Sequence, residues 1–332
     1  MQAFIVSLVF CAALILLLRE FAHSLGFVDH PGGRKQHAQP TPTVGGLAMF
    51  AGVLAALFSW KGLVGDIAVL MWCATVLVVL GVVDDRRGVP VATRLIIQVI
   101  LVLTVILGAE GLITHLGAIF GDEIKLGMFA VPFTVIAFVG GINAINMIDG
   151  ADGMAGKMAL ITLLGVAAIF GLSGNYELVP LVLALIGALT GFLLFNTRLI
   201  VARAWVFMGD AGSMWLGLVL GWLMSQVAGD RVAAEPAIVL WLFGIPLLDT
   251  LTVMLRRKRR KASVFDPDRT HIHHVLEDTG LTIKNAVLLL SGIQVLMVGA
   301  GVVFYMTEAP AALVFWSFVV VALLYYHRLR DA

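Results

Sequence analysis

The sequence predicts an all-α protein that crosses a membrane about eleven times, and two observations carry this prediction. Hydrophobic residues make up 60% of the 332 residues and charged residues only 13%, whereas a soluble domain carries about 25% charged residues. Apolar runs long enough to span a bilayer as a helix, about 20 residues, recur along the whole chain. The first run has no basic residue before it, so we expect a first membrane helix and not a cleaved signal peptide.

Eleven apolar runs are predicted to be membrane helices. They lie at residues 2–18, 44–60, 65–83, 92–109, 128–145, 154–172, 178–195, 212–228, 236–255, 285–305 and 310–326. Because the number is odd, the two termini are expected on opposite sides of the membrane. No internal repeat or low-complexity linker divides the chain, so we expect residues 1–332 to form a single integral-membrane domain.

The distribution of basic residues predicts the orientation. The connections between the runs alternate between two sets, and one set comprises residues 19–43, 84–91, 146–153, 196–211 and 256–284 with the C-terminus. Nineteen of the 22 Lys and Arg residues lie on or beside this set, whereas Lys61, Lys125 and Arg231 belong to the other. Since cytoplasmic loops are enriched in Lys and Arg, we expect the first set and the C-terminus in the cytoplasm and the N-terminus in the periplasm.

Charge and cysteine content narrow the class of function. The net charge is +1, which gives no bulk basic character for binding nucleic acid. The two cysteines, Cys11 and Cys73, lie in apolar runs, so neither a disulfide framework nor a zinc site is expected. Polar motifs gather instead on the predicted cytoplasmic side.

One polar run, GGINAINMIDGADGMAG, extends from residue 140 to 156. Asn143, Asn146, Asp149 and Asp152 follow one another at intervals of three, which on a helix keeps neighbours on adjoining parts of one face. They could be ordinary interfacial residues, but a carboxylate inside the bilayer costs roughly 3 kcal/mol on insertion scales. Amides and carboxylates are hard oxygen donors that suit Mg²⁺, and they can also hydrogen-bond a nucleobase or a sugar.

Four further acids lie at the ends of apolar runs or within one. Asp84 and Asp85 close a run in the motif VVDDRRG. A solvated helix end would explain them, yet an acidic pair is poorly placed at a helix C-terminus, where the macrodipole favours cations. Adjacent carboxylates suit metal binding, proton abstraction or nucleophilic attack.

Asp210, in FMGDAGS, could be an ordinary helix cap or could face a ligand that approaches the glycines beside it. Asp249, inside the predicted run 236–255, needs a partner or water, and its role stays open.

Two loops carry residues that suit phosphate. The motif RTHIHH brings together Arg269, His271, His273 and His274. With no cysteine nearby, and with carboxylates elsewhere on this side, anionic oxygens fit these residues better than zinc does.

The earlier loop, GGRKQHAQPTPTVGG, supplies Lys35, Thr41 and Thr43. A basic loop after a first membrane helix is usually an orientation signal. Its glycines and hydroxyls also suit a loop that faces phosphate.

Together these motifs place acids, amides, histidines and basic residues from distant segments on one membrane face. Acids that hold Mg²⁺ beside cations that hold phosphate are the components of phosphoryl transfer. No Walker A motif is present, so we do not expect the nucleotide site of a P-loop enzyme. A proton- or ion-coupled transporter is the alternative from another class, although transporters usually place such acids at the midplane.

The motifs VVDDRRG, NAINMIDGADGM, FMGDAGS and DPDRTHIHH occur in the order seen in the polyprenyl-phosphate N-acetylhexosamine-1-phosphate transferase superfamily, which this chain resembles over nearly its whole length. The HIHH form is more similar to the WecA branch than to MraY, which carries three consecutive histidines. The resemblance implies an MraY-like fold in the cytoplasmic (inner) membrane of a bacterium, with the active site on the cytoplasmic face.

The resemblance also implies a reaction. N-acetylglucosamine 1-phosphate is transferred from UDP-N-acetylglucosamine to undecaprenyl phosphate with release of UMP, as the first membrane step of O-antigen, common-antigen or teichoic-acid synthesis. Another UDP-N-acetylhexosamine donor is the alternative within the same chemistry. The reaction needs Mg²⁺, or Mn²⁺ in its place, and relatives are often homodimers.

Roles follow from the same resemblance. Asp84 and Asp85 match the essential acidic pair, of which one deprotonates or orients the lipid phosphate or, in a two-step scheme, acts as nucleophile. Asn146 and Asp210 match the metal-binding residues. The positions that match substrate-binding residues are Lys35, Thr41, Thr43, Asn143, Asp149, Asp152, Arg269, His271, His273 and His274.

Overall fold

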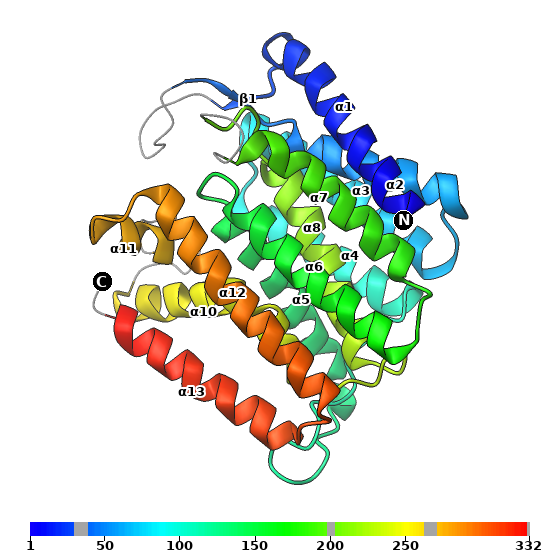
Figure 1. Cartoon of the computed structure of the whole chain (residues 1–332), viewed down its shortest axis with the longest axis vertical. Helices are drawn as coiled ribbons and strands as arrows, with labels where there is room; N and C mark the ends of the chain where they lie inside the picture. Colours follow the sequence, from blue (N-terminus) through cyan, green and yellow to red (C-terminus); the bar gives the residue numbers. More distant parts are fainter. Residues whose placement is uncertain (30–38, 198–202, 262–270, 331–332) are drawn as a thin grey trace.

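The computed structural model describes residues 1–29, 39–197, 203–261 and 271–330. Within these ranges the chain consists almost entirely of helices, which confirms the all-α prediction (Figure 1). The exceptions within these ranges are the connections, of which residues 109–126 are the longest, and a short antiparallel pair, β1 (Val28–Asp29) and β2 (Thr41–Pro42), in which Val28 lies opposite Pro42.

Nine of the described helices are long and apolar enough to cross a membrane. They are α1 (Gln2–Leu25), α3 (Gly65–Arg87), α4 (Val91–Gly108), the 3-10 turn η1 (Gly127–Phe129) continued by α5 (Ala130–Ile148), α6 (Met154–Ser173), α7 (Val179–Asn196), α8 (Asp210–Ala228), α12 (Ile283–Met306) and α13 (Ala311–Leu329). A further apolar helix, α2 (Gly45–Trp60), has 16 residues. These helices coincide with ten of the eleven predicted runs, and the protein is a polytopic membrane protein.

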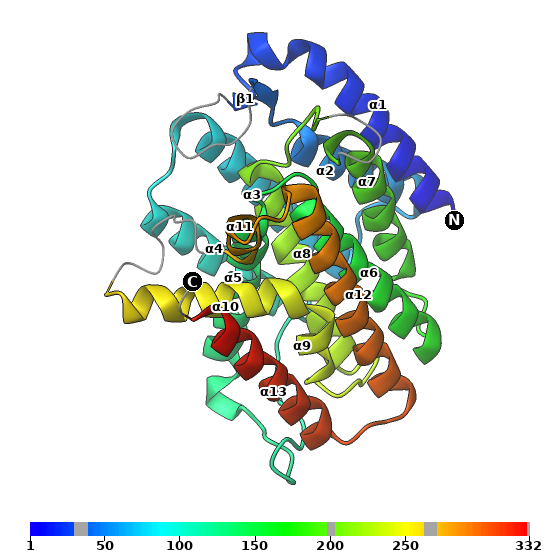
Figure 2. The same ribbon diagram turned by 60° about the vertical axis from the view of Figure 1, so that its left-hand side comes forward.

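The remaining prediction, one membrane helix over residues 236–255, is wrong. Two helices, α9 (Ile238–Leu242) and α10 (Gly244–Arg259), meet at Phe243, whose φ of −102° and ψ of 24° depart from helical values. As Figure 2 shows, α10 lies across the diagonal course of α12 and α13. The sequence hides this break because the run is apolar on both sides of it.

Side chains from two neighbouring helices satisfy the backbone groups that the break frees. Gln294 of α12 accepts a hydrogen bond from the N–H of Ile245 at 2.9 Å and donates one to the carbonyl of Leu242 at 2.9 Å. Thr162 of α6 donates to the same carbonyl at 2.8 Å. Both side chains are fully buried. Because no water replaces a lost backbone partner inside a membrane, Gln294 and Thr162 determine where this part of the chain turns.

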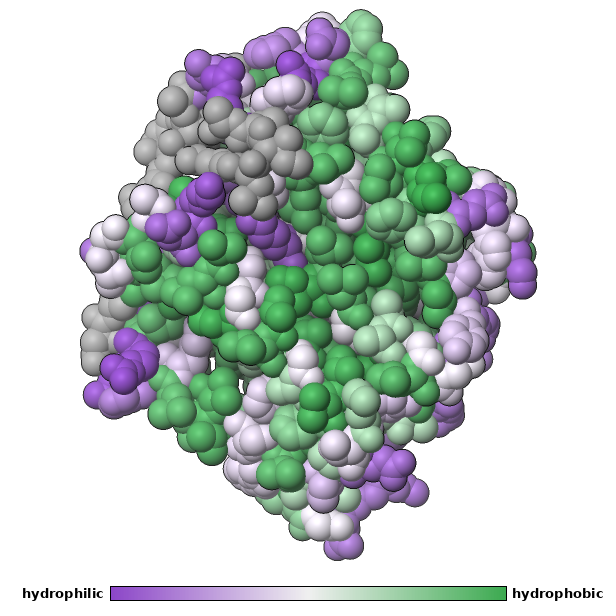
Figure 3. All heavy atoms as spheres, viewed as in Figure 1, coloured by the Kyte–Doolittle hydropathy of each residue, from purple (hydrophilic) through white to green (hydrophobic). Residues whose placement is uncertain are grey.

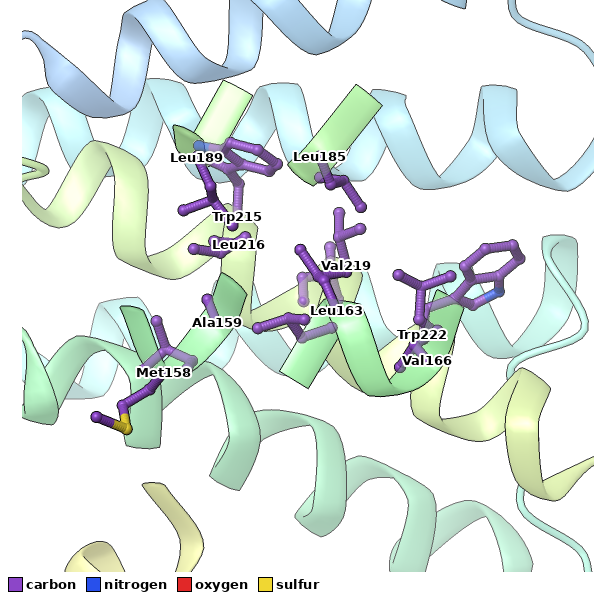
Figure 4. Packing of buried hydrophobic residues seen from close by; sticks show 14 of the residues in the cluster. Met158, Ala159, Leu163, Val166, Leu185, Leu189, Trp215, Leu216, Val219 and Trp222 are labelled. Atoms are coloured by element: carbon purple, nitrogen blue, oxygen red, sulfur yellow. The ribbon is translucent and has the colours of Figure 1, made fainter. Parts of the chain in front are cut away.

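The central helix of the bundle is α8. Its tryptophans, Trp215 and Trp222, are fully buried, and it packs against α3 and α5 and also against α2 and α6. Figure 4 shows its Trp215, Leu216, Val219 and Trp222 among Met158, Ala159, Leu163 and Val166 of α6 and Leu185 and Leu189 of α7. A helix enclosed on all sides holds its N-terminus in a fixed place, and that terminus begins at Asp210.

The outer helices cover this centre. α1 packs on α2 and α7, while α12 packs on α6 and α9 (Figure 1). In the view of Figure 3, apolar side chains form a broad area across the middle and polar residues gather towards opposite ends. This distribution is the one expected for a bundle whose middle faces lipid.

Several residues that were predicted to lie in loops belong to helices. α1 continues to Leu25, α3 continues to Arg87, and α5 continues to Ile148. A short helix, α11 (Ile272–Asp278), lies within the predicted loop 256–284. Asp84, Asp85 and Asn146 are therefore in the last turns of membrane helices, where residues of other helices form hydrogen bonds with them.

Candidate active site

Asp85, at the end of α3, caps the N-terminus of α8. Its carboxylate accepts hydrogen bonds from the backbone N–H of Asp210 at 2.9 Å and of Ala211 at 3.3 Å. The N-terminus of a helix is the positive end of its dipole and the C-terminus is the negative end. The N-terminus of α8 therefore stabilises the Asp85 carboxylate, which the C-terminus of α3 disfavours. Gly209 has a φ of +70°, and a Cβ there would lie 2.6 Å from Asp85, so this turn requires glycine.

Asp84, the other member of the pair, is held by different groups. One carboxylate oxygen accepts from the N–H of Val89 at 2.6 Å, and the other accepts from Nη1 of Arg94 at 2.5 Å. The same Nη1 lies 3.8 Å from a carboxylate oxygen of Asp210. Arg94, in the first turn of α4, therefore lies between Asp84 and Asp210.

Asn146, at the end of α5, joins Asp210 from the opposite side. Its amide nitrogen donates to Asp210 at 2.5 Å and to the hydroxyl of Ser213 at 2.9 Å. Ser213 in turn donates to the carbonyl of Gly209 at 3.2 Å. The ends of α3, α4, α5 and α8 thus converge, and we call Asp84, Asp85, Arg94, Asn146 and Asp210 the acidic centre.

The loop after α5 adds further negative charge to the acidic centre. Burial raises the pKa of Asp149 well above its usual value, and the charges of Asp210, Asp85 and Asp152 raise it further. The carboxylates predicted from separate motifs are therefore close enough to repel one another. Such a concentration of negative charge favours the binding of a cation.

Asn143 is held inside the bundle. Its amide nitrogen donates to the side-chain oxygen of Gln98 at 2.8 Å and to the carbonyl of Val139 at 2.8 Å. Gln98 is itself buried and donates to the sulfur of Met214. Both amide donors of Asn143 are used in this way, which leaves its carbonyl oxygen for a substrate, and its predicted binding role stays a prediction.

Thr41 and Thr43 are buried beside the chain that leads into Asp210. The N–H of Thr43 donates to the carbonyl of Phe27 at 3.0 Å, and the N–H of Phe207 donates to the carbonyl of Pro42 at 2.8 Å. The segment with the two threonines therefore fixes the approach to α8.

Two predicted binding residues, Lys35 and Arg269, lie outside the described residues. The structure therefore leaves their roles as predictions.

The three histidines form a row at the start of α11. Nδ1 of His271 lies 2.7 Å from Asp249, and Nδ1 of His274 lies 3.1 Å from Glu277. The ring of His273 lies between them, with centroids 5.9 Å from His271 and 4.1 Å from His274. A Cβ on Gly150 would lie 3.1 Å from Nε2 of His273, so the histidine row lies against the loop that carries Asp149.

The donor set of the acidic centre fits Mg²⁺. Among the described residues no three His, Cys, Asp or Glu side chains are arranged to hold a metal by themselves. Mg²⁺ is usually bound by one or two carboxylates together with waters and substrate phosphates, which matches a centre that has acids and a neighbouring basic and histidine-lined surface. Asp210, with the carbonyl oxygen of Asn146, is the pair that offers suitable oxygen atoms.

Sequence reasoning missed Arg94, Gln98 and Ser213 as members of the site. From the sequence alone Arg94 is one of the basic residues that indicate orientation, although Gln98 follows it by one helical turn on the same face of an apolar helix. Two polar side chains at this spacing were the available signal. Ser213 stood within the motif FMGDAGS and differs from an ordinary buried serine only through its contact with Asn146.

Comparison with known proteins identifies the family. Residues 67–228 match the model of glycosyl transferase family 4. An undecaprenyl-phosphate alpha-N-acetylglucosaminyl 1-phosphate transferase of Yersinia pestis is 33% identical over 97% of this chain and 89% of its own length. The proteins of the same name from Salmonella typhi and Escherichia coli (strain K12) are 32% and 31% identical, each over 88% of this chain and 80% of its own length. The acidic centre lies within residues 84–210, inside the matched region, and the chain belongs to the family of undecaprenyl-phosphate alpha-N-acetylglucosaminyl 1-phosphate transferases.

Proposed function

We propose that this protein transfers N-acetylglucosamine 1-phosphate from UDP-N-acetylglucosamine to undecaprenyl phosphate and releases UMP. The observation that carries the proposal is the convergence of Asp85, Asn146 and Arg94 on Asp210, with Asp84 paired to the same arginine, in a chain whose relatives bear the name of this activity. Two phosphate groups must meet in such a reaction. A site that combines cation-binding acids with an arginine suits that meeting.

The reaction requires an oxygen of the lipid phosphate to attack the sugar-bearing phosphorus of the UDP-sugar. The bond from that phosphorus to the bridging oxygen breaks, and UMP leaves with this oxygen. Asp84 or Asp85 takes a proton from the lipid phosphate or orients it. Arg94 donates to the phosphate oxygens on which negative charge develops.

Asp210 and Asn146 are the residues that would hold Mg²⁺, or Mn²⁺ in its place. When bound, the cation neutralises the charge of the diphosphate. Thr41, Thr43, Asn143, Asp149 and Asp152, with Lys35, are assigned to the uridine diphosphate side. Arg269 and the histidine row are assigned to the pyrophosphate and the sugar.

The orientation follows from the proposed substrates and the distribution of basic residues. A UDP-sugar is a cytoplasmic metabolite, so the acidic centre would face the cytoplasm, with the N-terminus on the periplasmic side of the bacterial inner membrane. Residues 1–332 would act as one domain, and a homodimer remains a further prediction. The product would serve as the lipid carrier for a cell-surface polysaccharide.

UMP release by the purified protein in detergent tests the proposal. We expect UMP that depends on undecaprenyl phosphate, UDP-N-acetylglucosamine and Mg²⁺, and that is lost in Asp210→Ala. Asp122→Ala, which removes an exposed acid outside the acidic centre, is the matched control and should behave like the wild type. Folded protein that releases no UMP with any UDP-sugar would contradict the proposal and restore the transporter alternative.

The alternative donor is tested in the same assay. Other UDP-N-acetylhexosamines are added in competition with UDP-N-acetylglucosamine, and the ratio of kcat/KM values decides the natural substrate. A preference for another donor would keep the chemistry and change the sugar.

A further inference from the structure

The role of Asp249, which the sequence left open, can be inferred from its contacts. Asp249 lies in α10, and its side chain is 2% exposed. One carboxylate oxygen lies 2.7 Å from Nδ1 of His271, and the other accepts from the N–H of Ile272 at 2.9 Å. The hydroxyl of Tyr325 donates to the second oxygen at 3.4 Å. A single carboxylate therefore holds both the ring of His271 and the start of α11.

This arrangement determines which nitrogen of His271 carries a proton. A carboxylate accepts hydrogen bonds, so Nδ1 of His271 must be the donor in their 2.7 Å contact. In the neutral ring, Nε2 then has a free lone pair. A carboxylate behind a histidine fixes tautomer and ring orientation in this way in many functional sites.

The other nitrogen of His271 is available for a substrate. Among the described residues, no donor or acceptor pairs with Nε2 of His271. The ring stacks on that of His273, at an interplanar angle of 18°, and Nε2 of His273 lies against Gly150. His271 thus belongs to the histidine row beside the acidic centre.

We propose that Asp249 is a positioning residue, which keeps the proton of His271 on Nδ1 and presents Nε2 to the bound substrate. Nε2 then accepts a hydrogen bond when the ring is neutral and donates one to a phosphate oxygen when the ring is protonated. The inference rests on the proposed transferase function. The break between α9 and α10 is part of this device, because the direction of α10 brings Asp249 to His271.

Asp249→Asn is the sharpest test because it keeps the size and shape of the side chain. An amide has one oxygen where the carboxylate has two. If its nitrogen faces His271, it donates to Nδ1 and forces the proton onto Nε2; if its nitrogen faces Ile272, two donors oppose each other. Either result disturbs the presentation of Nε2.

The experiment is a double-mutant cycle on UMP release, with kcat and KM for the UDP-sugar measured separately. Wild type and Asp122→Asn come first, because Asp122 is an exposed acid outside the acidic centre and its variant should retain wild-type activity. We expect Asp249→Asn to lower kcat/KM about 10–100-fold. The double variant Asp249→Asn/His271→Ala should be no less active than His271→Ala, because Asp249 acts through His271.

The outcomes separate the inference from the function on which it rests. Absence of UMP release by folded wild-type protein overturns the proposed function. In an active enzyme, wild-type activity of Asp249→Asn overturns the inference, as do losses that multiply in the double variant. If Asp249→Asn does not fold, Asp249→Glu replaces it in the cycle. This variant keeps the charge but displaces the carboxylate by one methylene, and the same lack of additivity with His271→Ala is expected.

Discussion

Two clusters at opposite ends of α3 each combine one arginine with several carboxylates, and they use them differently. At the start of α3, Arg231 forms ion pairs with Asp66, Glu110 and Glu177. At the other end, Arg94 pairs with Asp84 at 2.5 Å and lies 3.8 Å from Asp210. We call the first group the Arg231 cluster.

In the Arg231 cluster each of the three carboxylates forms an ion pair with the arginine. Burial by itself would lower the pKa of Arg231, but Glu177, Asp66 and Glu110 together raise it above its usual value. Asn175 also donates to the carbonyl of Arg231 at 2.9 Å. These contacts join the chain around residues 66, 110, 175 and 231, so the cluster serves to hold loops together.

In the acidic centre, by contrast, some of the carboxylates have no basic partner in the part of the chain that the structure describes. Among the described residues no basic side chain pairs with Asp85 or Asp149. Backbone N–H groups of Asp210 and Ala211 hold Asp85 instead. The comparison teaches that a functional cluster differs from a structural one less in its composition than in the carboxylates that it leaves without a basic partner.

The same substitution at both arginines tests this comparison, and the larger effect is expected at Arg94. Arg94→Gln should lower kcat for UMP release by about 100- to 1,000-fold, the cost of removing one group that stabilises developing charge. The melting temperature in detergent should change little, because glutamine can still donate a hydrogen bond to Asp84. Wild-type activity of the Arg94→Gln enzyme would contradict the role of Arg94 in the reaction.

Arg231→Gln should have the reverse profile. Three ion pairs around a side chain that is 17% exposed are lost, and we expect the free energy of unfolding to fall by about 1–2 kcal/mol. The activity of the folded protein should stay close to that of the wild type. A melting curve and a UMP assay on one preparation decide the matter, and a large loss of kcat without a loss of stability would break the comparison.

The smallest effect concerns the pH dependence of stability. Because the pKa of Asp149 is raised in the folded protein, folding favours its protonated form, and its contribution to stability is lost as pH rises through that folded pKa. Asp149→Asn should therefore stabilise the ligand-free protein increasingly as the pH is raised above the ordinary aspartate pKa, about 3.9. Asp122→Asn, an exposed acid, should show no such trend in melting temperature. A difference between wild type and Asp149→Asn that is constant with pH would contradict the assignment.

Much of the fold follows from the sequence, because membrane helices are defined by apolar length. The run 236–255 shows where this reasoning stops: its break depends on Gln294 and Thr162, which approach Leu242 from other helices. Hydropathy does not contain that information. A membrane helix can turn wherever distant side chains replace its lost hydrogen bonds.

The sequence predicts the acidic residues of the site well, but it predicts much less well which residues contact them. Asp84, Asp85, Asn146 and Asp210 stand out because charge and amide groups are rare in apolar runs. Arg94, by contrast, resembles any basic residue at a helix end until the structure places it between Asp84 and Asp210. Asp249 has its partner His271 at a separation of 22 residues, and no local pattern joins the two.

The hydrogen bonds that Gln294 and Thr162 form at the α9–α10 break have a consequence for the synthesis of the protein. Every member of the acidic centre is made by residue 210, and the region matched by the family model ends at residue 228. The hydrogen bonds at the break, however, need Gln294, which belongs to the penultimate helix, α12. Since a chain emerges from the ribosome N-terminus first, a nascent protein would carry its carboxylates in the membrane before α10 had its final direction. Insertion of α12 would then act as the step of maturation that completes the histidine side of the site.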